Sequence, residues 1–335
     1  MFREAAQAPA AVRAQLAANA TRVARLAAQL RAAPPRAVVT CARGSSDHAA
    51  TFARYLIETR LGLLTSSAAP SVSSVYEAAT DLTGTLLLAI SQSGASPDLI
   101  AAARSARAAG ARVVALVNAE TSPLAQLADE LIPLGAGAEL SVAATKSYIA
   151  SLAAIVQLIA CWSGDAELTA SLEQAPGELQ RAWELEWRAA VQELTPATNL
   201  YVIARGLGLG AAQEAALKFK ETCGLHAEGL SAAELRHGPM ALVRAGFPLL
   251  LFTQSDESRG GVTQLAAELA ASGARVLLAG SSAAGATQLP TIASHPAIEP
   301  MLFAQSFYRM ANALALARGR DPDRPPHLSK VTETV

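Results

Sequence analysis

Residues 37–48 read AVVTCARGSSDH, and the interpretation of the whole sequence starts from this stretch. A short apolar run rich in β-branched residues, Ala37 to Cys41, is followed at once by a glycine with small hydroxylated residues, and then by a helix-length stretch, His48 to Leu61. An apolar run of this length predicts a buried strand, and a glycine-serine cluster predicts a tight turn. The stretch therefore predicts one strand, one turn and one helix of an α/β sheet.

The same alternation continues through the first half of the sequence. Four more short apolar runs predict strands over Ser71 to Val75, Leu86 to Ile90, Arg112 to Val117 and Leu131 to Leu134. Alanine-rich stretches of helical length separate them, such as Pro97 to Ala109, which Gly110 ends. Strands that are apolar on both faces and alternate with helices predict an open, doubly wound parallel sheet.

A second α/β pattern begins after Pro196. It predicts strands over Leu200 to Ala204, Pro248 to Thr253 and Arg275 to Ala279, with helices over 211–223 and 262–272 between them. Arg43-Gly44 and Arg205-Gly206 each follow the end of an apolar run, at matching places in the two halves. The predicted fold class is therefore α/β, with two tandem copies of one domain.

Prolines and changes in composition give the expected domain boundaries. We expect a helical lead-in over 1–34, a first domain over 35–164, a linker helix over 165–196, a second domain over 197–320 and a tail over 321–335. Pro34-Pro35 stops the lead-in, and Pro196 ends the linker. The tail begins with three prolines in six residues, so its first part cannot be helical.

The composition excludes several classes of protein. The 335 residues carry 27 basic and 28 acidic side chains, a net charge of −1, and 51% of them are hydrophobic. A chain of this kind can bury a sizeable core and is not disordered. Its balanced charge gives no basic surface for nucleic acid or for an anionic membrane.

The cysteines and the longest apolar run favour a cytoplasmic protein. Cys41, Cys161 and Cys223 are odd in number and far apart, which supports neither a disulfide framework nor a zinc ribbon. We interpret them as small packing residues. The run from Tyr148 to Trp162 is shorter than a membrane span and contains Ser151 and a glutamine, so we predict a buried or interface helix there.

Two turns of the first half have the composition of a phosphate-binding site. Gly44-Ser45-Ser46-Asp47-His48 and Ser91-Gln92-Ser93-Gly94-Ala95-Ser96 each lie between a predicted strand and a predicted helix. Glycine and small hydroxyls let backbone N–H groups approach an oxyanion at a helix N-terminus. No Gly-Lys-Ser/Thr follows, which excludes a Walker loop, so the predicted phosphate site has no cation. Turn formation and helix capping alone are the alternative for each turn.

Gly206-Leu207-Gly208-Leu209-Gly210 resembles a dinucleotide fingerprint only superficially. Its third glycine comes one position early, and Glu228 is expected in a loop rather than at a strand end. An NAD-dependent enzyme is therefore the weaker alternative, and a tight turn accounts for these glycines.

Acid/base chemistry is predicted in the second half. Glu214, Lys218 and Glu221 have the i, i+4 and i+7 spacing that places them on one helix face, directly after a strand-end turn. A solvated stripe would have the same spacing, but the position at a strand end favours proton transfer. His237, which precedes Gly-Pro on a predicted loop, is a second acid/base candidate.

Taken together, these motifs resemble the double sugar-isomerase (SIS) domain of glucosamine-6-phosphate synthases. The resemblance covers nearly the whole chain in order, and is closer still to stand-alone glucosamine-6-phosphate deaminases of that family. The motifs that carry it are Arg43-Gly44-Ser45-Ser46, Ser91 to Ser96, Ala143-Ala144-Thr145-Lys146, Glu214-x-x-x-Lys218-x-x-Glu221, Glu234-Leu235-Arg236-His237-Gly238-Pro239 and Leu328-Ser329-Lys330-Val331-Thr332. Ala95 and Ala144 depart from the synthase pattern, which has an acidic residue and a serine there.

The resemblance implies a role for each matching residue. Glu221 would move a proton between C1 and C2, with Lys218 and Glu214 as its helix partners. His237 would open the sugar ring from the neighbouring subunit of a homodimer, and Lys330 could form a Schiff base with a ketose phosphate. The resemblance implies no cofactor and no metal. The residues it assigns to the sugar and its phosphate are Ser45, Ser46, Ser91, Gln92, Ser93, Ser96, Val142 and Ser329.

The sequence also suggests the direction of the reaction. The synthases carry a glutaminase domain with a cysteine at position two, whereas this sequence begins Met1-Phe2, so we expect no built-in ammonia donor. The resulting hypothesis is conversion of glucosamine 6-phosphate to fructose 6-phosphate and ammonia. A fructosamine-phosphate deglycase, another phosphosugar isomerase, the isomerase module of an aminotransferase and a sugar-phosphate sensor without catalysis remain alternatives.

Overall fold

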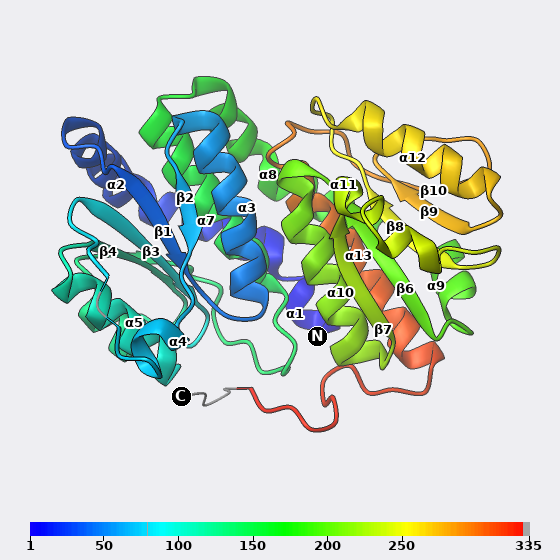
Figure 1. The fold of residues 1–335 in the computed structure, drawn as a ribbon, viewed down its shortest axis with the longest axis horizontal. Helices are drawn as coiled ribbons and strands as arrows, with labels where there is room; N and C mark the ends of the chain where they lie inside the picture. The colour runs from blue at the N-terminus through cyan, green and yellow to red at the C-terminus, as the bar shows by residue number, and fades with distance from the viewer. Residues whose placement is uncertain (79, 331–335) are drawn as a thin grey trace. The chain divides into compact units, whose positions relative to one another are not determined.

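Parallel strands form the centre of the fold. A computed structural model of the chain describes residues 1–78 and 80–330. Within them lie two five-stranded parallel sheets, in the orders β2-β1-β3-β4-β5 and β7-β6-β8-β9-β10 (Figure 1). The strands are β1 (Ala37–Cys41), β2 (Thr65–Ser67), β3 (Thr85–Ser91), β4 (Arg112–Val117), β5 (Glu130–Pro133), β6 (Asn199–Ala204), β7 (His226–Ser231), β8 (Pro248–Phe252), β9 (Arg275–Ala279) and β10 (Thr287–Leu289).

Helices connect and cover these strands. They are α1 (Phe2–Ala5), α2 (Ala8–Ala32), α3 (Ser45–Leu61), α4 (Ser71–Ser74), α5 (Pro97–Ala108), α6 (Pro123–Leu127), α7 (Lys146–Ser163), α8 (Ala166–Glu184), α9 (Arg188–Leu194), α10 (Leu209–Cys223), α11 (Ala232–Leu235), α12 (Arg259–Ala271) and α13 (Glu299–Ala317). Two short 3₁₀ helices are η1 (Gly206–Gly208) and η2 (Pro239–Leu242).

The two sheets have the same topology. Counted from the first strand of each sheet, both follow the order 2-1-3-4-5, and the prediction of a duplicated α/β domain is confirmed. The first connection of each sheet leads toward one edge, and the next connections lead toward the other edge. The switch point of the topology therefore lies between β1 and β3 in the first sheet, and between β6 and β8 in the second. Ligands of such sheets bind beyond the carboxyl ends of the strands at this switch point.

The chain folds as two compact units, each built around one sheet. The N-terminal unit contains residues 10–139 and 146–173, together with Ser329 and Lys330. The C-terminal unit contains residues 1–9, 140–145 and 174–328. Each unit is described by itself below.

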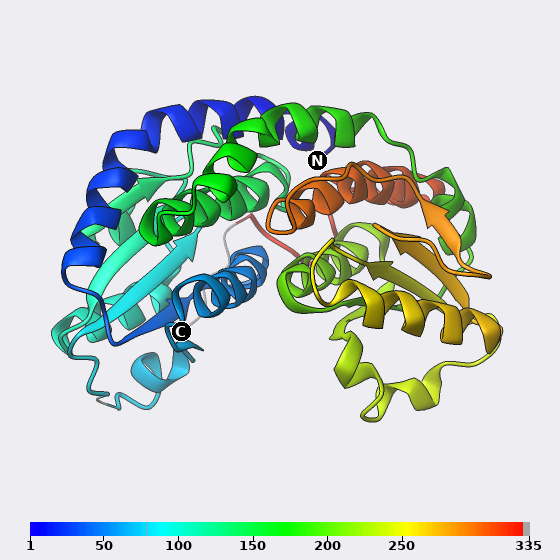
Figure 2. The ribbon, with the colours of Figure 1, turned by 90° about the horizontal axis from the view of Figure 1, so that it is seen from above.

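In the N-terminal unit, helices cover both faces of the sheet (Figure 2). Alternate strand residues such as Leu87 and Val113 pack against Leu99 and the alanines of α5. On the other face α3 packs against α7. Because α5 directly follows β3 in the chain, its N-terminus lies near the carboxyl end of that strand.

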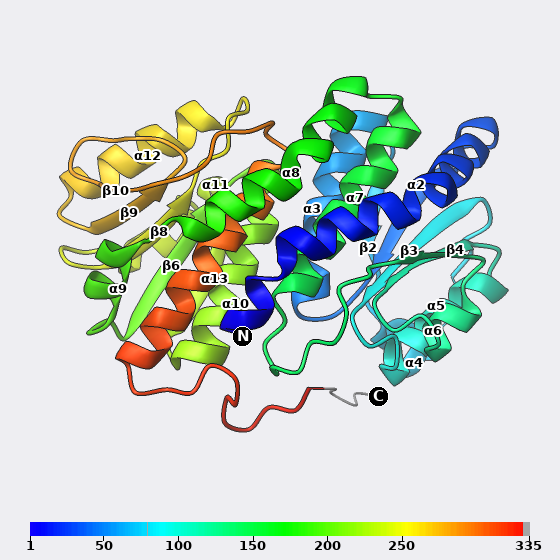
Figure 3. The same ribbon diagram turned by 180° about the vertical axis from the view of Figure 1, so that it is seen from behind.

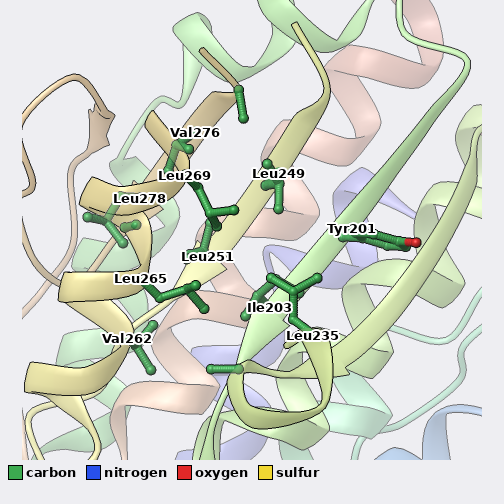
Figure 4. Close-up of a cluster of buried hydrophobic side chains, with 13 residues drawn as sticks. Tyr201, Ile203, Leu235, Leu249, Leu251, Val262, Leu265, Leu269, Val276 and Leu278 are labelled. Carbon is green, nitrogen blue, oxygen red and sulfur yellow. The ribbon is translucent and has the colours of Figure 1, made fainter. Parts of the chain in front are cut away.

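In the C-terminal unit, the two faces of the sheet contact different helices. Residues of β6, β8 and β9, among them Ile203 and Leu251, form a buried cluster with Leu235 of α11 and Leu265 of α12 (Figure 4). On the opposite face α10 packs along β6 and β7 and against α13. Helix α13 also packs against α9, and both helices are labelled in Figure 3.

Some elements differ from those predicted. The predicted strand Ser71 to Val75 is helix α4, because Pro70 begins a turn in which its carbonyl accepts the Ser74 N–H. The edge strand is instead Thr65–Ser67, whose serines are exposed. Glu228 lies on β7, another edge strand, and not in a loop. Both edge strands are too polar to be recognised as buried strands.

Helix α7 contains the longest apolar run. Among the described residues it is the one helix long and apolar enough to cross a membrane, but 89% of it is buried inside the protein. It also packs against α3, so the prediction of a buried helix over Tyr148 to Trp162 is confirmed.

Replacing Gly94 by alanine tests the turn after β3. Its φ is +61°, and a Cβ there would lie against Ser122 and 2.8 Å from Val117 Cγ1. We expect the free energy of unfolding to fall by about 3 kcal/mol, since left-handed backbone and overpacking each cost about 1–2 kcal/mol. Gly62→Ala has a similar φ of +66° but open space around it, so its loss should be about 1 kcal/mol. Equal losses in urea denaturation would contradict this packing.

Candidate functional site

The first part of the site lies at the carboxyl ends of β1 and β3. These strands are neighbours, with Cys41 opposite Ala89. Helix α3 begins just after β1 with Gly44 as its N-cap, and α5 begins after β3 with Ser96 as its N-cap. Neither cap residue makes a side-chain hydrogen bond to its helix. In the first turn of α5 the Leu99 N–H donates instead to Asp98 Oδ1, and in α3 the Ser46 and Asp47 N–H groups donate to the carbonyls of Arg43 and Gly44. Both helices nevertheless direct the positive end of their dipole to this edge of the sheet, which suits the binding of an anion.

The turn from Ser91 to Ser96 is held by its own hydroxyls. Ser91 Oγ accepts the Gly94 N–H at 2.9 Å, and Ser93 Oγ accepts the Ala95 N–H at 3.3 Å. The side chains of Gln92 and Ser96 are half-buried. The structure therefore gathers the predicted residues Ser45, Ser46, Ser91, Gln92, Ser93 and Ser96 at the ends of two adjacent strands.

An ion pair joins these two turns. Arg43 follows β1, and its Nε and Nη2 each lie 2.8 Å from Oδ2 of Asp98 in the first turn of α5. The Asp98 side chain is 1% exposed, whereas that of Arg43 is 51% exposed. Sequence reasoning missed this pair, because the two residues are 55 positions apart and neither belongs to a recognisable charge pattern.

The matching turn of the second sheet is closed. The segment after β8, Thr253-Gln254-Ser255-Asp256-Glu257-Ser258, matches Ser91 to Ser96, of which Ser91 ends β3 and the others follow it. Asp256 stands in the place of Gly94, and its Oδ1 accepts hydrogen bonds from the backbone N–H and the hydroxyl of Ser258. Gln254 is fully buried and donates to the Arg205 carbonyl and to Asp256. A carboxylate of the protein thus accepts from Ser258 in the second turn, whereas Ser91 to Ser96 include no carboxylate. We call the first turn open and the second turn closed.

A separate group of candidate residues, in the C-terminal unit, is a charged array on α10. Lys218 Nζ lies 2.6 Å from Glu221 Oε2 and 3.3 Å from Glu214 Oε1. Lys218 is fully buried and Glu214 is 1% exposed, while Glu221 is 19% exposed. The hydroxyl of Tyr308 on α13 donates to Glu214 at 2.9 Å. The three charged side chains thus form one array, and Lys218 and Glu214 are buried rather than solvated. The sequence did not predict the contact of Glu214 with Tyr308.

The charge state of Lys218 follows from its neighbours. Burial by itself would lower its pKa, but the carboxylates of Glu214 and Glu221 outweigh this effect, and the pKa is raised above the ordinary value. Lys218 is thus a permanent cation near neutral pH. Burial raises the pKa of the nearby Cys223 thiol to about 11, so this cysteine is not a thiolate. Within residues 1–78 and 80–330, no group of three His, Cys, Asp or Glu side chains could hold a metal ion.

Glu221 opens onto a cavity of about 330 Å³. The end of α10 forms one wall, with Lys220 and Gly224, and residues of the tail form the other. Two guanidinium groups, of Arg320 and Arg324, line it as well. Of the array on α10, the cavity is lined by Glu221 alone, which is also its most exposed member.

The remaining predicted site residues lie in turns, loops and the tail. His237 is exposed in the C-terminal unit, between α11 and η2. Val142 belongs to the same unit and is half-buried. In the N-terminal unit, Lys330 Nζ lies 3.6 Å from the buried carboxylate of Glu139, which also accepts from Ser147, and Ser329 precedes it. Val331 and Thr332 of the tail motif lie outside the described residues. The roles of these residues stay predictions.

Removing the ammonium of Lys218 should destabilise the protein strongly. Lys218→Met leaves the buried Glu214 without its cation, for which about 3–5 kcal/mol is typical. Lys220→Met, at an exposed position of the same helix, should change the free energy of unfolding by less than about 0.5 kcal/mol. Because the folded pKa is raised above 10.5, the difference should be full below pH 10.5 and shrink at higher pH. Urea denaturation measures it, and similar losses for both variants would contradict the assignment.

Comparison with known proteins gives the family. The SIS domain family matches residues 33–161 and 193–289. The glutamine–fructose-6-phosphate aminotransferase (isomerizing) of Aeropyrum pernix is 36% identical over 312 residues, which cover 87% of this chain and 50% of that protein. That of Zymomonas mobilis is 34% identical over 88% of this chain and 51% of its own length. The chain thus spans about half the length of the curated relatives it matches.

Solved structures with a similar fold support the same family assignment. A putative phosphosugar isomerase from Silicibacter pomeroyi is 43% identical, with a TM-score of 0.93, and the match covers 96% of this chain and 99% of that one. The glucosamine-6-phosphate deaminase of Thermotoga maritima, at 21% identity and a TM-score of 0.80 over 99% of both chains, shares the fold. Two sheets of one topology, each with its switch point, and a family match in each half have one explanation: the chain belongs to the SIS domain family and carries two SIS domains.

Proposed function

We propose that this protein is a glucosamine-6-phosphate deaminase, which converts glucosamine 6-phosphate to fructose 6-phosphate and ammonia. The observation that carries the proposal is the array on α10, where a buried ammonium holds the carboxylate of Glu221 at the wall of a cavity. A carboxylate fixed in this way can take a proton from carbon and return it to the neighbouring carbon. In the turn after β3, the hydroxyls of Ser91 and Ser93 accept backbone N–H groups and can donate their own hydrogens to the phosphate.

The proposed reaction begins with ring opening. His237 transfers a proton to the ring oxygen, the bond from C1 to the ring oxygen breaks, and the C1 hydroxyl loses its proton to water, which gives the open-chain 2-amino aldehyde. Glu221 then removes the proton from C2, and the electron pair moves toward the aldehyde oxygen to give an enol that bears the amine. Return of the proton to C1 produces the 2-imine of fructose 6-phosphate. Lys218 stabilises the negative charge that develops during the transfer.

Hydrolysis of the imine completes the proposed cycle. Water adds to C2, the C–N bond breaks, and ammonia leaves with fructose 6-phosphate as the other product. Lys330 can take part by attacking C2 first, so that ammonia leaves and a lysine imine is hydrolysed afterwards. The ion pair with Glu139 keeps this lysine in place.

The family relationship supports the substrate class and leaves one alternative. The chain is 43% identical to a putative phosphosugar isomerase, and an aldose–ketose isomerase would need the same proton transfer without loss of nitrogen. The aminotransferase relatives are about twice as long, so their use of glutamine is not assumed for this chain.

A measurement of ammonia release distinguishes the deaminase from an aldose–ketose isomerase. The purified protein, given glucosamine 6-phosphate without glutamine, should release ammonia and fructose 6-phosphate in equal amounts. Glu221→Gln should abolish turnover and keep binding of the sugar phosphate, whereas Glu228→Gln, at an exposed position of β7, should keep full activity. Interconversion of sugar phosphates without ammonia would favour the isomerase, and a Glu221→Gln rate near that of the wild type would overturn the role of Glu221.

A mixing experiment tests the proposed homodimer with His237 acting across subunits. Glu221→Gln and His237→Asn should each be inactive. If one site takes Glu221 from one subunit and His237 from its partner, a mixed dimer contains one intact site. Random pairing of equal amounts should then restore about a quarter of the wild-type activity, measured as ammonia release after co-expression. No recovery in dimers shown to be mixed would place both residues in a site of one chain.

A further inference from the structure

The turns after β1 and β3 were predicted to form a phosphate site without a cation, but the structure places a guanidinium there. Arg43 directly precedes Gly44, the N-cap of α3, and its side chain reaches Asp98, two residues beyond the N-cap of α5. The Arg43 side chain therefore spans the two helix N-termini that the proposed function assigns to the phosphate.

The geometry of the ion pair leaves part of the guanidinium available. Nε and Nη2 both donate to the same oxygen, Oδ2 of Asp98, while Oδ1 accepts the Leu99 N–H. Nη1 has no hydrogen bond or ion pair with another described residue, and half of the Arg43 side chain is exposed. Arginine suits this arrangement because its planar fork can bind a fixed carboxylate along one edge and an incoming oxyanion along another.

The second sheet provides an internal comparison. There the turn is closed by the carboxylate of Asp256, and the residue at the place of Asp98 is Gly260. Arg205 stands at the place of Arg43, and the matching position at the start of α12 thus carries no carboxylate. The sheet with the open turn is thus the one with the arginine–aspartate pair.

We propose that Arg43 is a substrate-binding residue that donates to the phosphate of the sugar, and that Asp98 is the positioning residue that holds it over the turn. This inference rests on the proposed function for the location of the phosphate. It adds the missing positive charge to that site. It also explains why a buried carboxylate stands beside a site for an anion: Asp98 fixes the direction of the guanidinium and contributes little exposed charge of its own.

The test uses inorganic phosphate and glucosamine 6-phosphate as probes of the full chain. Arg43→Gln should weaken phosphate binding, measured by calorimetry, and raise KM by about tenfold or more, as expected for a charge-assisted hydrogen bond, with kcat changed less than about threefold. Arg43→Lys should recover part of the affinity. Because Arg43→Gln leaves Asp98 buried without a cation, Arg43→Gln combined with Asp98→Asn removes both charges and should show the same loss of affinity.

The matched control is the ion pair of Arg107 with Asp129, at the other end of α5. Arg107→Gln with Asp129→Asn should leave phosphate affinity and KM unchanged. Phosphate affinity and KM within twofold of the wild type in both Arg43 variants would overturn the inference while the proposed function stands. Loss of phosphate binding in these variants without ammonia release by the wild type would support Arg43 and reject the deaminase. Failure of the wild type to bind either probe would overturn both.

Discussion

The burial of Lys218 is the constraint on which the C-terminal unit depends. An ammonium group without exposed surface is tolerated only where carboxylates replace the water that it loses, and Glu214 and Glu221 do so from the same face of one helix. This spacing fixes which face of α10 turns inward, and Tyr308 completes the hydrogen bonding of Glu214 from α13. The helix therefore cannot rotate without exposing or separating these charges. Glu221, the least buried of the three, is consequently presented to the cavity in one orientation.

Much of this architecture could be predicted from short apolar runs. β1, β4 and β9 have the predicted bounds, because strands buried on both faces must be apolar throughout. Edge strands are not under this constraint, and β2, β7 and β10 are polar or very short. They acquire their structure from the neighbouring strand. Ser71 to Ser74 shows the opposite case, since Pro70 and local hydrogen bonds form a helical turn in spite of the β-branched residues nearby.

The candidate site residues also differ in how far apart in the sequence their contacts lie. The array on α10 could be predicted because a helix brings i, i+4 and i+7 together by its own geometry. The pair of Arg43 and Asp98 forms only when two strands become neighbours and two helices begin at the same edge of the sheet. The turn motif alone therefore suggested hydrogen-bond donors without a charge. Tyr308 is similar, since its contact with Glu214 depends on how α13 packs against α10.

Asp256 has a consequence for how a duplicated domain diverges. At one position of the two corresponding turns the first has Gly94 and the second has Asp256, and the Asp256 carboxylate accepts hydrogen bonds within its own turn. A turn whose donors are bound by its own carboxylate needs no ligand to satisfy them. In this chain the copies have become unequal partners, one with an open turn and the other with the charged helix. One polypeptide can thus keep two copies of a fold in which only one copy has its turn filled by its own carboxylate.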